Sequence, residues 1–283
     1  MTEVKTQMSD DLAGILAAKS FDRNGKRIIP FFACREAARK CGATPRRAEI
    51  TALRNGICPS RYERSVGTFG LEGQARLLES RAAVVGCGGL GGWIIEILAR
   101  AGVGEIVMAD GDVFDDNNLN RQLYAHEENI GMSKAEAAAE RVRLVNGAVS
   151  AIPKTLFVNE ENGAEVLNGC SVVIDALDGN SARSAVLNIC SGLGIPFVHG
   201  AIGGCFAQCA VYRPGDRPLW ERAGTPDKGG EVTSGNPPFT PPFAASIEAA
   251  EALKILAGLD GALNGELLWF DLRNNEMRKL RIH

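Results

Sequence analysis

Apolar and polar positions change their period several times after about residue 80. Short apolar runs, typical of buried strands, occur at 82–86, 105–110, 151–158, 170–177 and 195–202. Segments with helical spacing separate several of them, at 93–101, 133–146 and 181–191. Ser133 precedes the second of these helices and Glu136 follows three residues later, which is the spacing of a capping box.

This alternation predicts the fold class. Repeated strand–helix–strand units form parallel sheets with right-handed crossovers and helices on both faces. We therefore expect a Rossmann-like α/β fold, with a doubly wound, mostly parallel sheet.

Two further regions differ from this pattern. Residues 213–243 are rich in proline and glycine and have little periodicity, which predicts a long loop of the kind that is usually functional or mobile. A helix at 244–257 and a hairpin-like pair of strands at 266–272 and 276–282 are expected to complete the domain.

The first sixty residues predict a separate, helical module. Segments 28–40 and 45–54 read as helices, the second capped by Thr44 with Pro45 in its first turn. Two helices around a tight turn, with arginines nearby, also fit a helix-turn-helix. The acidic chain favours a module that docks on the main domain or on a partner, so we expect a helical module at 1–60 and an α/β domain at 61–283.

Composition limits the partners and the cellular compartment that we expect. A net charge of −3 among 283 residues gives no electrostatic reason to expect nucleic acid or anionic lipid as a partner. The acidic, polar start lacks a signal peptide's apolar core, and no apolar stretch reaches the length of a membrane span. The eight cysteines form no C-x-x-C pair, so we expect a cytoplasmic protein with reduced, mostly buried thiols.

The strongest chemical signal is a glycine loop between the strand at 82–86 and the next helix. Gly86, Gly88, Gly89 and Gly91 allow the backbone to approach a phosphate, and the helix N-terminus supplies free N–H groups. Asp110 ends the next strand, where an acid binds ribose hydroxyls. These features predict a nucleotide site and, taken alone, suggest NAD first.

Three later residues favour ATP instead. Arg121 and Lys134 follow the ribose acid, and two cations suit a triphosphate whose charge grows in the transition state. Asp178 follows the strand in 170–177, where it can hold Mg²⁺ against the phosphates.

In combination, these segments resemble the ThiF/MoeB/HesA family, the bacterial relatives of ubiquitin-activating enzymes. The resemblance runs from about Arg61 to the C-terminus. Its landmarks are RYERS (61–65), GCGGLGG (86–92), MADGDVFDDNNLNRQ (108–122), GMSKAE (131–136), DALDGN (175–180) and SIEAAEALKILAG (246–258).

The resemblance implies a role for each matched residue. Asp110 would bind the ribose, Arg121 and Lys134 the triphosphate, and Asp178 the Mg²⁺, with Asn118 beside the phosphates. The implied nucleotide-binding set also includes Asp112, which lies in the third of these landmarks. Arg64 resembles an arginine that reaches the nucleotide of the other subunit, which implies a homodimer with shared sites.

The substrate that the resemblance implies is a small β-grasp sulfur carrier protein. Its Gly-Gly C-terminus would attack the α-phosphate of ATP to give an acyl adenylate and pyrophosphate. A carboxylate is already ionised near neutral pH, so positioning and charge neutralisation would carry this chemistry.

The chain departs from the family pattern in three places. It lacks the two C-x-x-C pairs that bind a structural zinc in many members, so no zinc site is expected. The stretch 228–236 offers Thr233 and Ser234 but no cysteine, so the activated carrier would pass to a separate sulfur donor. Gly179 stands where asparagine commonly follows the metal-site Asp. A catalytic role for Cys205 or Cys209 is a minor alternative to ordinary burial, as is redox sensitivity of Cys87 in the glycine loop.

Other functions remain open at this point. The same scaffold could adenylate a small molecule or a tRNA base, although the acidic charge argues against RNA. A non-catalytic scaffold would have no need to keep Arg64, Asp110, Arg121, Lys134 and Asp178. An NAD-dependent oxidoreductase lacks a suitably placed catalytic group, and the sequence gives His126 and His199 no evident partner.

Overall fold

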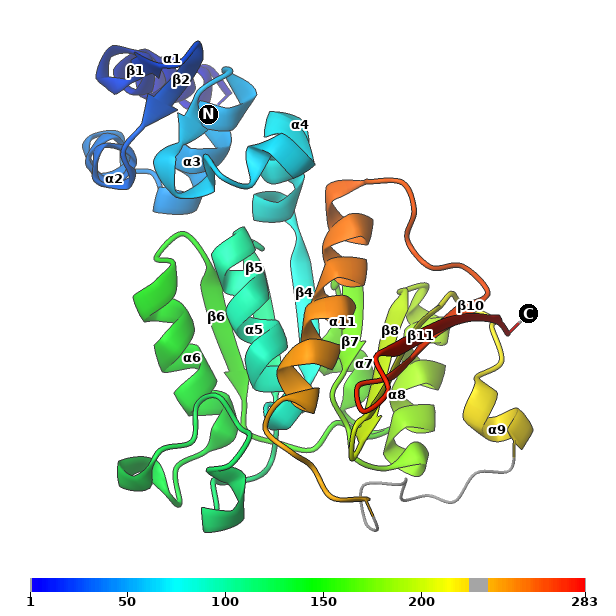
Figure 1. The fold of residues 1–283 in the computed structure, drawn as a ribbon. Helices are drawn as coiled ribbons and strands as arrows, with labels where there is room; N and C mark the ends of the chain where they lie inside the picture. The colour runs from blue at the N-terminus through cyan, green and yellow to red at the C-terminus, as the bar shows by residue number, and fades with distance from the viewer. Residues whose placement is uncertain (1, 224–233, 283) are drawn as a thin grey trace.

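A computed structural model describes residues 2–223 and 234–282, and its centre is an eight-stranded sheet with the order β11-β10-β9-β8-β7-β4-β5-β6 (Figure 1). Five strands of this sheet are parallel: β4 (Arg81–Val85), β5 (Glu105–Ala109), β6 (Ser150–Lys154), β7 (Val172–Asp175) and β8 (Phe197–Gly203). Strands β9 (Phe206–Tyr212), β10 (Glu266–Asp271) and β11 (Glu276–Arg281) extend the sheet in antiparallel order. The predicted α/β class and mostly parallel sheet are confirmed.

Helices cover both faces of the sheet, because alternate residues of each strand point to opposite sides. Ala82 and Val84 of β4 pack on one side, against α5 (Gly89–Ala101), α6 (Lys134–Val145) and α11 (Thr240–Ala257). Ala83 and Val85 pack on the other, against α7 (Gly163–Leu167) and α8 (Asn180–Leu193). The sheet is therefore doubly wound, as expected.

The predicted elements of this part lie within a few residues of the observed ones, with three exceptions. Strand β6 ends at Lys154, four residues before the predicted end. Helix α5 begins at Gly89, four residues before the predicted start, because the last glycines of the loop form its first turn. Helix α11 begins at Thr240 rather than 244, with Pro241 in its first turn. The predicted loop at 213–243 therefore ends earlier, and it contains the short helix α9 (Leu219–Ala223).

The first sixty residues contain more than the two predicted helices. Helix α1 (Thr2–Lys19) leads into a hairpin of β1 (Phe21–Arg23) and β2 (Lys26–Ile29), and β3 (Cys58–Pro59) pairs with β2. Helix α2 (Phe31–Lys40) begins after Pro30, so residues 28 and 29 belong to a strand and not to the predicted helix. Helix α3 (Pro45–Arg54) matches its prediction, including the bond from Arg47 N to the Thr44 hydroxyl.

This N-terminal part packs on the α/β domain. Through a short 3₁₀ turn (Ser60–Tyr62) it continues into α4 (Val66–Glu79), near the amino ends of β4 and β5 (Figure 1). Arg46 donates to the Gly104 carbonyl at 2.7 Å and pairs with Glu105 at 2.9 Å, whereas Arg54 pairs with Glu72 and Glu79. These arginines neutralise carboxylates of the same chain, which weighs against the helix-turn-helix interpretation.

Among the residues that the structure describes, no helix combines the length and the apolar character needed to cross a membrane.

Candidate active site

A cavity of about 1000 Å³ opens at the carboxyl ends of the parallel strands. It lies where the chain order reverses, since the strands after β4 continue to one side as β5 and β6, and to the other as β7 and β8. Open α/β sheets bind ligands at this switch point. The lining includes eight of the predicted site residues, namely Gly86, Gly88, Gly89, Asp110, Asp112, Arg121, Lys134 and Asp178.

The glycine loop needs glycine at its two tightest points. Gly86 has a φ of +97°, and a Cβ there would lie 2.3 Å from the carbonyl oxygen of Ala176. Gly91 does not line the cavity; a Cβ there would lie 1.8 Å from the carbonyl oxygen of Gly86. Gly91 therefore allows α5 to pack on the loop, and Gly88 and Gly89 form the wall toward a ligand.

Asp110 holds the loop in shape. Its carboxylate accepts hydrogen bonds from the backbone N–H of Cys87 at 2.7 Å and of Asp112 at 2.8 Å. The Asp112 carboxylate in turn pairs with Lys134 at 3.1 Å, and this holds the buried lysine stem against the cavity. The predicted ribose acid and phosphate lysine thus belong to one hydrogen-bonded unit.

Arg121 lies beside this unit. Its guanidinium donates to the carbonyl of Asn117 at 2.8 Å and to the Asn120 side chain at 2.9 Å. Gln122, which the sequence reasoning left without a role, is only 7% exposed, and its side-chain oxygen has no hydrogen-bond partner within the described residues. It lines the cavity beside Gly88, so its carboxamide lies at the wall of the predicted nucleotide site.

Asp178 is placed by a turn that two buried charges hold. The Asp175 carboxylate accepts from the N–H of Leu177 at 2.9 Å and from Arg183, and Arg183 also donates to the Leu177 carbonyl at 2.6 Å. Burial alone would raise the pKa of Asp175, but the charge of Arg183 and the bond from His199 leave it below its ordinary value. The ionised Asp175–Arg183 pair fixes the turn that carries Asp178 into the cavity.

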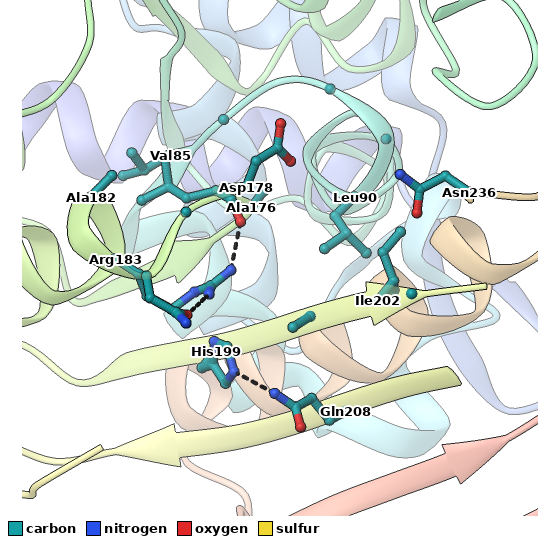
Figure 2. Close-up of a pocket in the computed structure, with 18 of the residues that line it drawn as sticks. Val85, Leu90, Ala176, Asp178, Ala182, Arg183, His199, Ile202, Gln208 and Asn236 are labelled. Atoms are coloured by element: carbon teal, nitrogen blue, oxygen red, sulfur yellow. Dashed lines mark hydrogen bonds between the residues drawn. The ribbon is translucent and has the colours of Figure 1, made fainter. Parts of the chain in front are cut away.

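His199 has partners, contrary to the expectation from sequence. Its Nδ1 lies 2.7 Å from Asp175. Its Nε2 lies 3.2 Å from the side-chain nitrogen of Gln208 (Figure 2). Its ring packs against Trp220, with centroids 4.8 Å apart. The partners lie on β7, β9 and α9, and no spacing within one segment could reveal a network built from three elements.

Two predicted residues lie elsewhere in the single chain. Asn118 is buried, and its side chain bonds to Asp115 N and to Asn117, so it shapes the loop and does not line the cavity. Arg64 follows Tyr62, which packs against Gly102 at the C-terminal end of α5. The glycine loop lies at the N-terminal end of that 13-residue helix, roughly 20 Å away.

Of the cysteines near the site, Cys87 and Cys209 are buried, whereas Cys205 is intermediate in exposure and does not line the cavity. Cys87 and Cys209 are each 1% exposed, and burial, followed by the charges of Asp110 and Glu248 respectively, raises the pKa of both thiols well above the ordinary value. Thiolates, not thiols, are nucleophiles. The geometry therefore argues against a catalytic Cys209 or a redox-sensitive Cys87.

The proposed acceptor loop is only partly described. Thr233 and the residues 228–232 before it lie outside the described residues. Ser234 lines the cavity near Gly204. Within the described part of the chain, no three His, Cys, Asp or Glu side chains are grouped so that they could hold a metal ion.

The arrangement as a whole suits a phosphorylated ligand. Backbone N–H groups at a helix N-terminus, a lysine and an arginine surround one end of the cavity, and Asp178 contributes a carboxylate. The described lining offers no thiolate or other activated nucleophile. Such a site can neutralise growing negative charge and position two reactants.

Sequence comparison assigns the family. The ThiF family model matches residues 62–283, and the chain therefore belongs to the ThiF family. The predicted resemblance is confirmed, and with it the enzyme class, an adenylyltransferase.

Curated relatives support this assignment over most of the chain. The SAMP-activating enzyme E1 of Haloferax volcanii is 40% identical over 221 residues, which cover 75% of this chain and 80% of that protein. The sulfur carrier protein adenylyltransferase of Thermus thermophilus is 34% identical over 237 residues, covering 78% and 86%. The adenylyltransferase and sulfurtransferase MOCS3 of Xenopus laevis is 31% identical, but the chain spans only 51% of its length.

Solved structures share the fold. Escherichia coli MccB with ATP matches with a TM-score of 0.65 and 19% identity, covering 88% of this chain and 82% of that one. PaaA matches with a TM-score of 0.67 and 22% identity, covering 78% and 72%.

Proposed function

We propose that this chain uses ATP and Mg²⁺ to adenylate the C-terminal Gly-Gly carboxylate of a small ubiquitin-like sulfur carrier protein and releases pyrophosphate. The observation that carries the proposal is the convergence of Arg121, Lys134 and Asp178 on the cavity that the glycine loop lines. The names of the relatives from Haloferax volcanii and Thermus thermophilus support the substrate class.

In this reaction one carboxylate oxygen of the carrier attacks the α-phosphorus. The bond from that phosphorus to the bridging oxygen of the β-phosphate breaks, and pyrophosphate leaves with the electron pair. Lys134 and Arg121 stabilise the charge that builds on the phosphates, and the loop N–H groups hold them in place. No base is required, because the attacking carboxylate is already ionised.

The residues present fit a magnesium ion. Mg²⁺ in phosphoryl-transfer sites takes one or two protein carboxylates and completes its shell with phosphate oxygens and water. Asp178 lines the cavity and could supply that carboxylate, beside the phosphate-binding cations. A bound Mg²⁺ would neutralise the departing pyrophosphate.

Three further parts of the proposal concern the oligomeric state, the cellular location and the fate of the product. We infer a homodimer, because Arg64 is far from the cavity of its own chain and would serve the site of a second copy. We also infer a cytoplasmic location, which agrees with the free, mostly buried cysteines. The product would pass to a separate sulfur donor, because the stretch 228–236 contains no cysteine.

ATP–pyrophosphate exchange tests the function directly. The protein is incubated with ATP, Mg²⁺, labelled pyrophosphate and a panel of Gly-Gly-ending carriers, each paired with a variant that lacks the last glycine. Exchange that requires one intact carrier supports the proposal. ATP binding without exchange for any carrier would contradict it and favour a small-molecule substrate or a scaffold.

A further inference from the structure

The cavity is longer than the predicted nucleotide site. Its volume of about 1000 Å³ is at the upper limit for small-ligand pockets. The predicted nucleotide residues line the part near β4 and β5, whereas Gln208, Phe206 and Trp269 line the part near β9 and β10. Asp178, after β7, lies between the two parts, so the far part is where a second substrate has room.

Hydrogen-bond chemistry fixes the tautomer of His199 in this far part. An ionised Asp175 can only accept, so the Nδ1 atom of His199 must carry the proton of their 2.7 Å bond. Burial, with the charge of Arg183, lowers the pKa of His199, and the ring is therefore neutral near pH 7. Its Nε2 is then an acceptor and receives an N–H of Gln208.

The same bond fixes the carboxamide of Gln208. Its nitrogen is turned to the histidine and its oxygen away from it (Figure 2). The side chain is half-buried and lines the cavity, and within residues 2–223 and 234–282 its oxygen accepts no hydrogen bond. The chain Arg183–Asp175–His199–Gln208 thus presents one oriented acceptor to a ligand.

We propose that Gln208, held in one orientation by His199, accepts a hydrogen bond from a backbone N–H in the C-terminal tail of the protein substrate. The inference rests on the proposed function. A glycine tail has no side chains, so a site can recognise it only through its main chain, and an oriented carboxamide oxygen matches a peptide N–H. His199 is a positioning residue that acts through Gln208.

The strand spacing indicates which N–H is recognised. Strands β7 and β9 are separated by β8, so Gln208 lies roughly 10 Å from the end of β7, which precedes Asp178. An extended chain advances about 3.4 Å per residue. The recognised N–H is therefore two or three residues before the carboxylate that reacts near Asp178.

The test combines substitutions in the enzyme and in the substrate tail. Gln208→Leu is expected to raise the KM for the carrier about three- to tenfold, the worth of one neutral hydrogen bond, and to leave the KM for ATP unchanged. Semisynthetic carriers in which one of the last four peptide bonds is an ester lack one N–H each. With the wild-type enzyme one ester raises the KM similarly; with Gln208→Leu that ester has no further effect.

Matched variants separate positioning from general damage. His199→Phe keeps a ring against Trp220 but removes the acceptor, and should raise the carrier KM as Gln208→Leu does, with kcat at saturating carrier retained. His199→Gln, whose oxygen can accept the same bond, should recover part of the loss. Gln122→Leu removes a carboxamide from the other end of the cavity and should raise the KM for ATP instead.

Two results would overturn the inference. One is a Gln208→Leu effect on the KM for ATP alone, which would place a nucleotide N–H against Gln208. The other is additivity of Gln208→Leu with every ester. Both are measured on a wild-type enzyme that catalyses exchange, so either can occur while the proposed function stands, and absence of exchange by the wild type would reject the function itself.

Discussion

The buried ion pair of Asp175 and Arg183 fixes the position of the exposed carboxylate of Asp178. Asp178 itself is exposed, but the turn that carries it is bonded to Asp175 and Arg183, both of which are almost fully buried. Breaking a buried pair by removing one partner is costly. The position of the proposed metal ligand is therefore fixed before any ligand arrives.

Replacing Asp178 should separate catalysis from folding. Asp178→Ala and the isosteric Asp178→Asn should each lose at least about a hundredfold in adenylation rate, because the carboxylate for Mg²⁺ is gone. Pyrophosphate exchange across a Mg²⁺ titration measures the loss, and thermal denaturation checks the fold. Wild-type exchange in either variant would remove Asp178 from the metal site.

Glu248 is a buried carboxyl with no hydrogen-bond partner for either oxygen within the described chain, facing Gly200 across the α11–β8 interface. Burial, with the charge of Asp175 adding to it, raises its pKa well above the ordinary 4.5. The unfolded chain therefore releases this proton at a lower pH than the folded chain. The stability that Glu248 contributes is complete below about pH 4.5 and is lost as pH rises toward the folded pKa.

Glu248→Gln should remove this pH dependence. We expect similar free energies of unfolding for variant and wild type near pH 5, with the variant gaining about 1.4 kcal/mol per pH unit above that until the folded carboxyl ionises. Urea denaturation at several pH values measures the difference. Glu251→Gln is the control on the same helix: Glu251 accepts from Lys254 and from Leu263 N, so its loss should destabilise the protein.

At the scale of elements, the contact between the glycine loop and α5 is the tightest near the site. Gly91→Ala should destabilise the protein by about 1–3 kcal/mol and weaken ATP binding, since the new Cβ would displace the Gly86 carbonyl. Gly192, in the last turn of α8, has open space around it, and Gly192→Ala should stabilise by about 0.5–1 kcal/mol. Urea denaturation and nucleotide titration of both variants check the contrast, and equal effects would contradict it.

Local patterns in the sequence predicted most elements of the sheet. Strand residues such as Val84 and Ile106 form continuous apolar runs, because parallel strands are buried on both faces. The hairpin of β1 and β2 was missed because exposed residues such as Asp22 and Lys26 give no alternating pattern. The early start of α11 was missed because its first turn contains two prolines.

The predicted site divides in the same way. Gly86, Asp110 and Lys134 belong to motifs that are local in sequence, and the fold brings them to one cavity. Gln208 and His199 owe their proposed role to strand pairing between β8 and β9 and to a carboxylate on β7. Such contacts depend on register across the sheet, which one sequence does not display.

At the scale of the whole molecule, Arg64 is a predicted site residue that lies far from the cavity of its own chain. If two copies share their sites, a subunit with Arg64→Ala and one with Arg121→Ala can together form one intact site. Random mixing makes half of the dimers mixed, each with one working site of two, so about a quarter of wild-type activity should return. Exchange assays on co-refolded mixtures measure this, and no recovery would argue against shared sites.

The cluster that joins the N-terminal part to the catalytic domain contains residues of both. Ile28, Leu53 and Cys58 pack with Tyr62 and Leu78 in one buried apolar group. The exposed turn at 54–56 lies between Leu53 and Cys58, which both belong to this buried group.

A cut in that turn therefore ought to produce two fragments that stay together. After brief trypsin treatment at Arg54, the nicked protein should elute from a sizing column at the volume of the uncut protein and separate into two bands only under denaturing conditions. The first sixty residues would then be held to the rest of the chain by apolar packing and ion pairs, and not only by the peptide link that the cut removes. Deleting them would expose the apolar side chains of Tyr62 and Leu78 to water, at the end of the sheet opposite the active site.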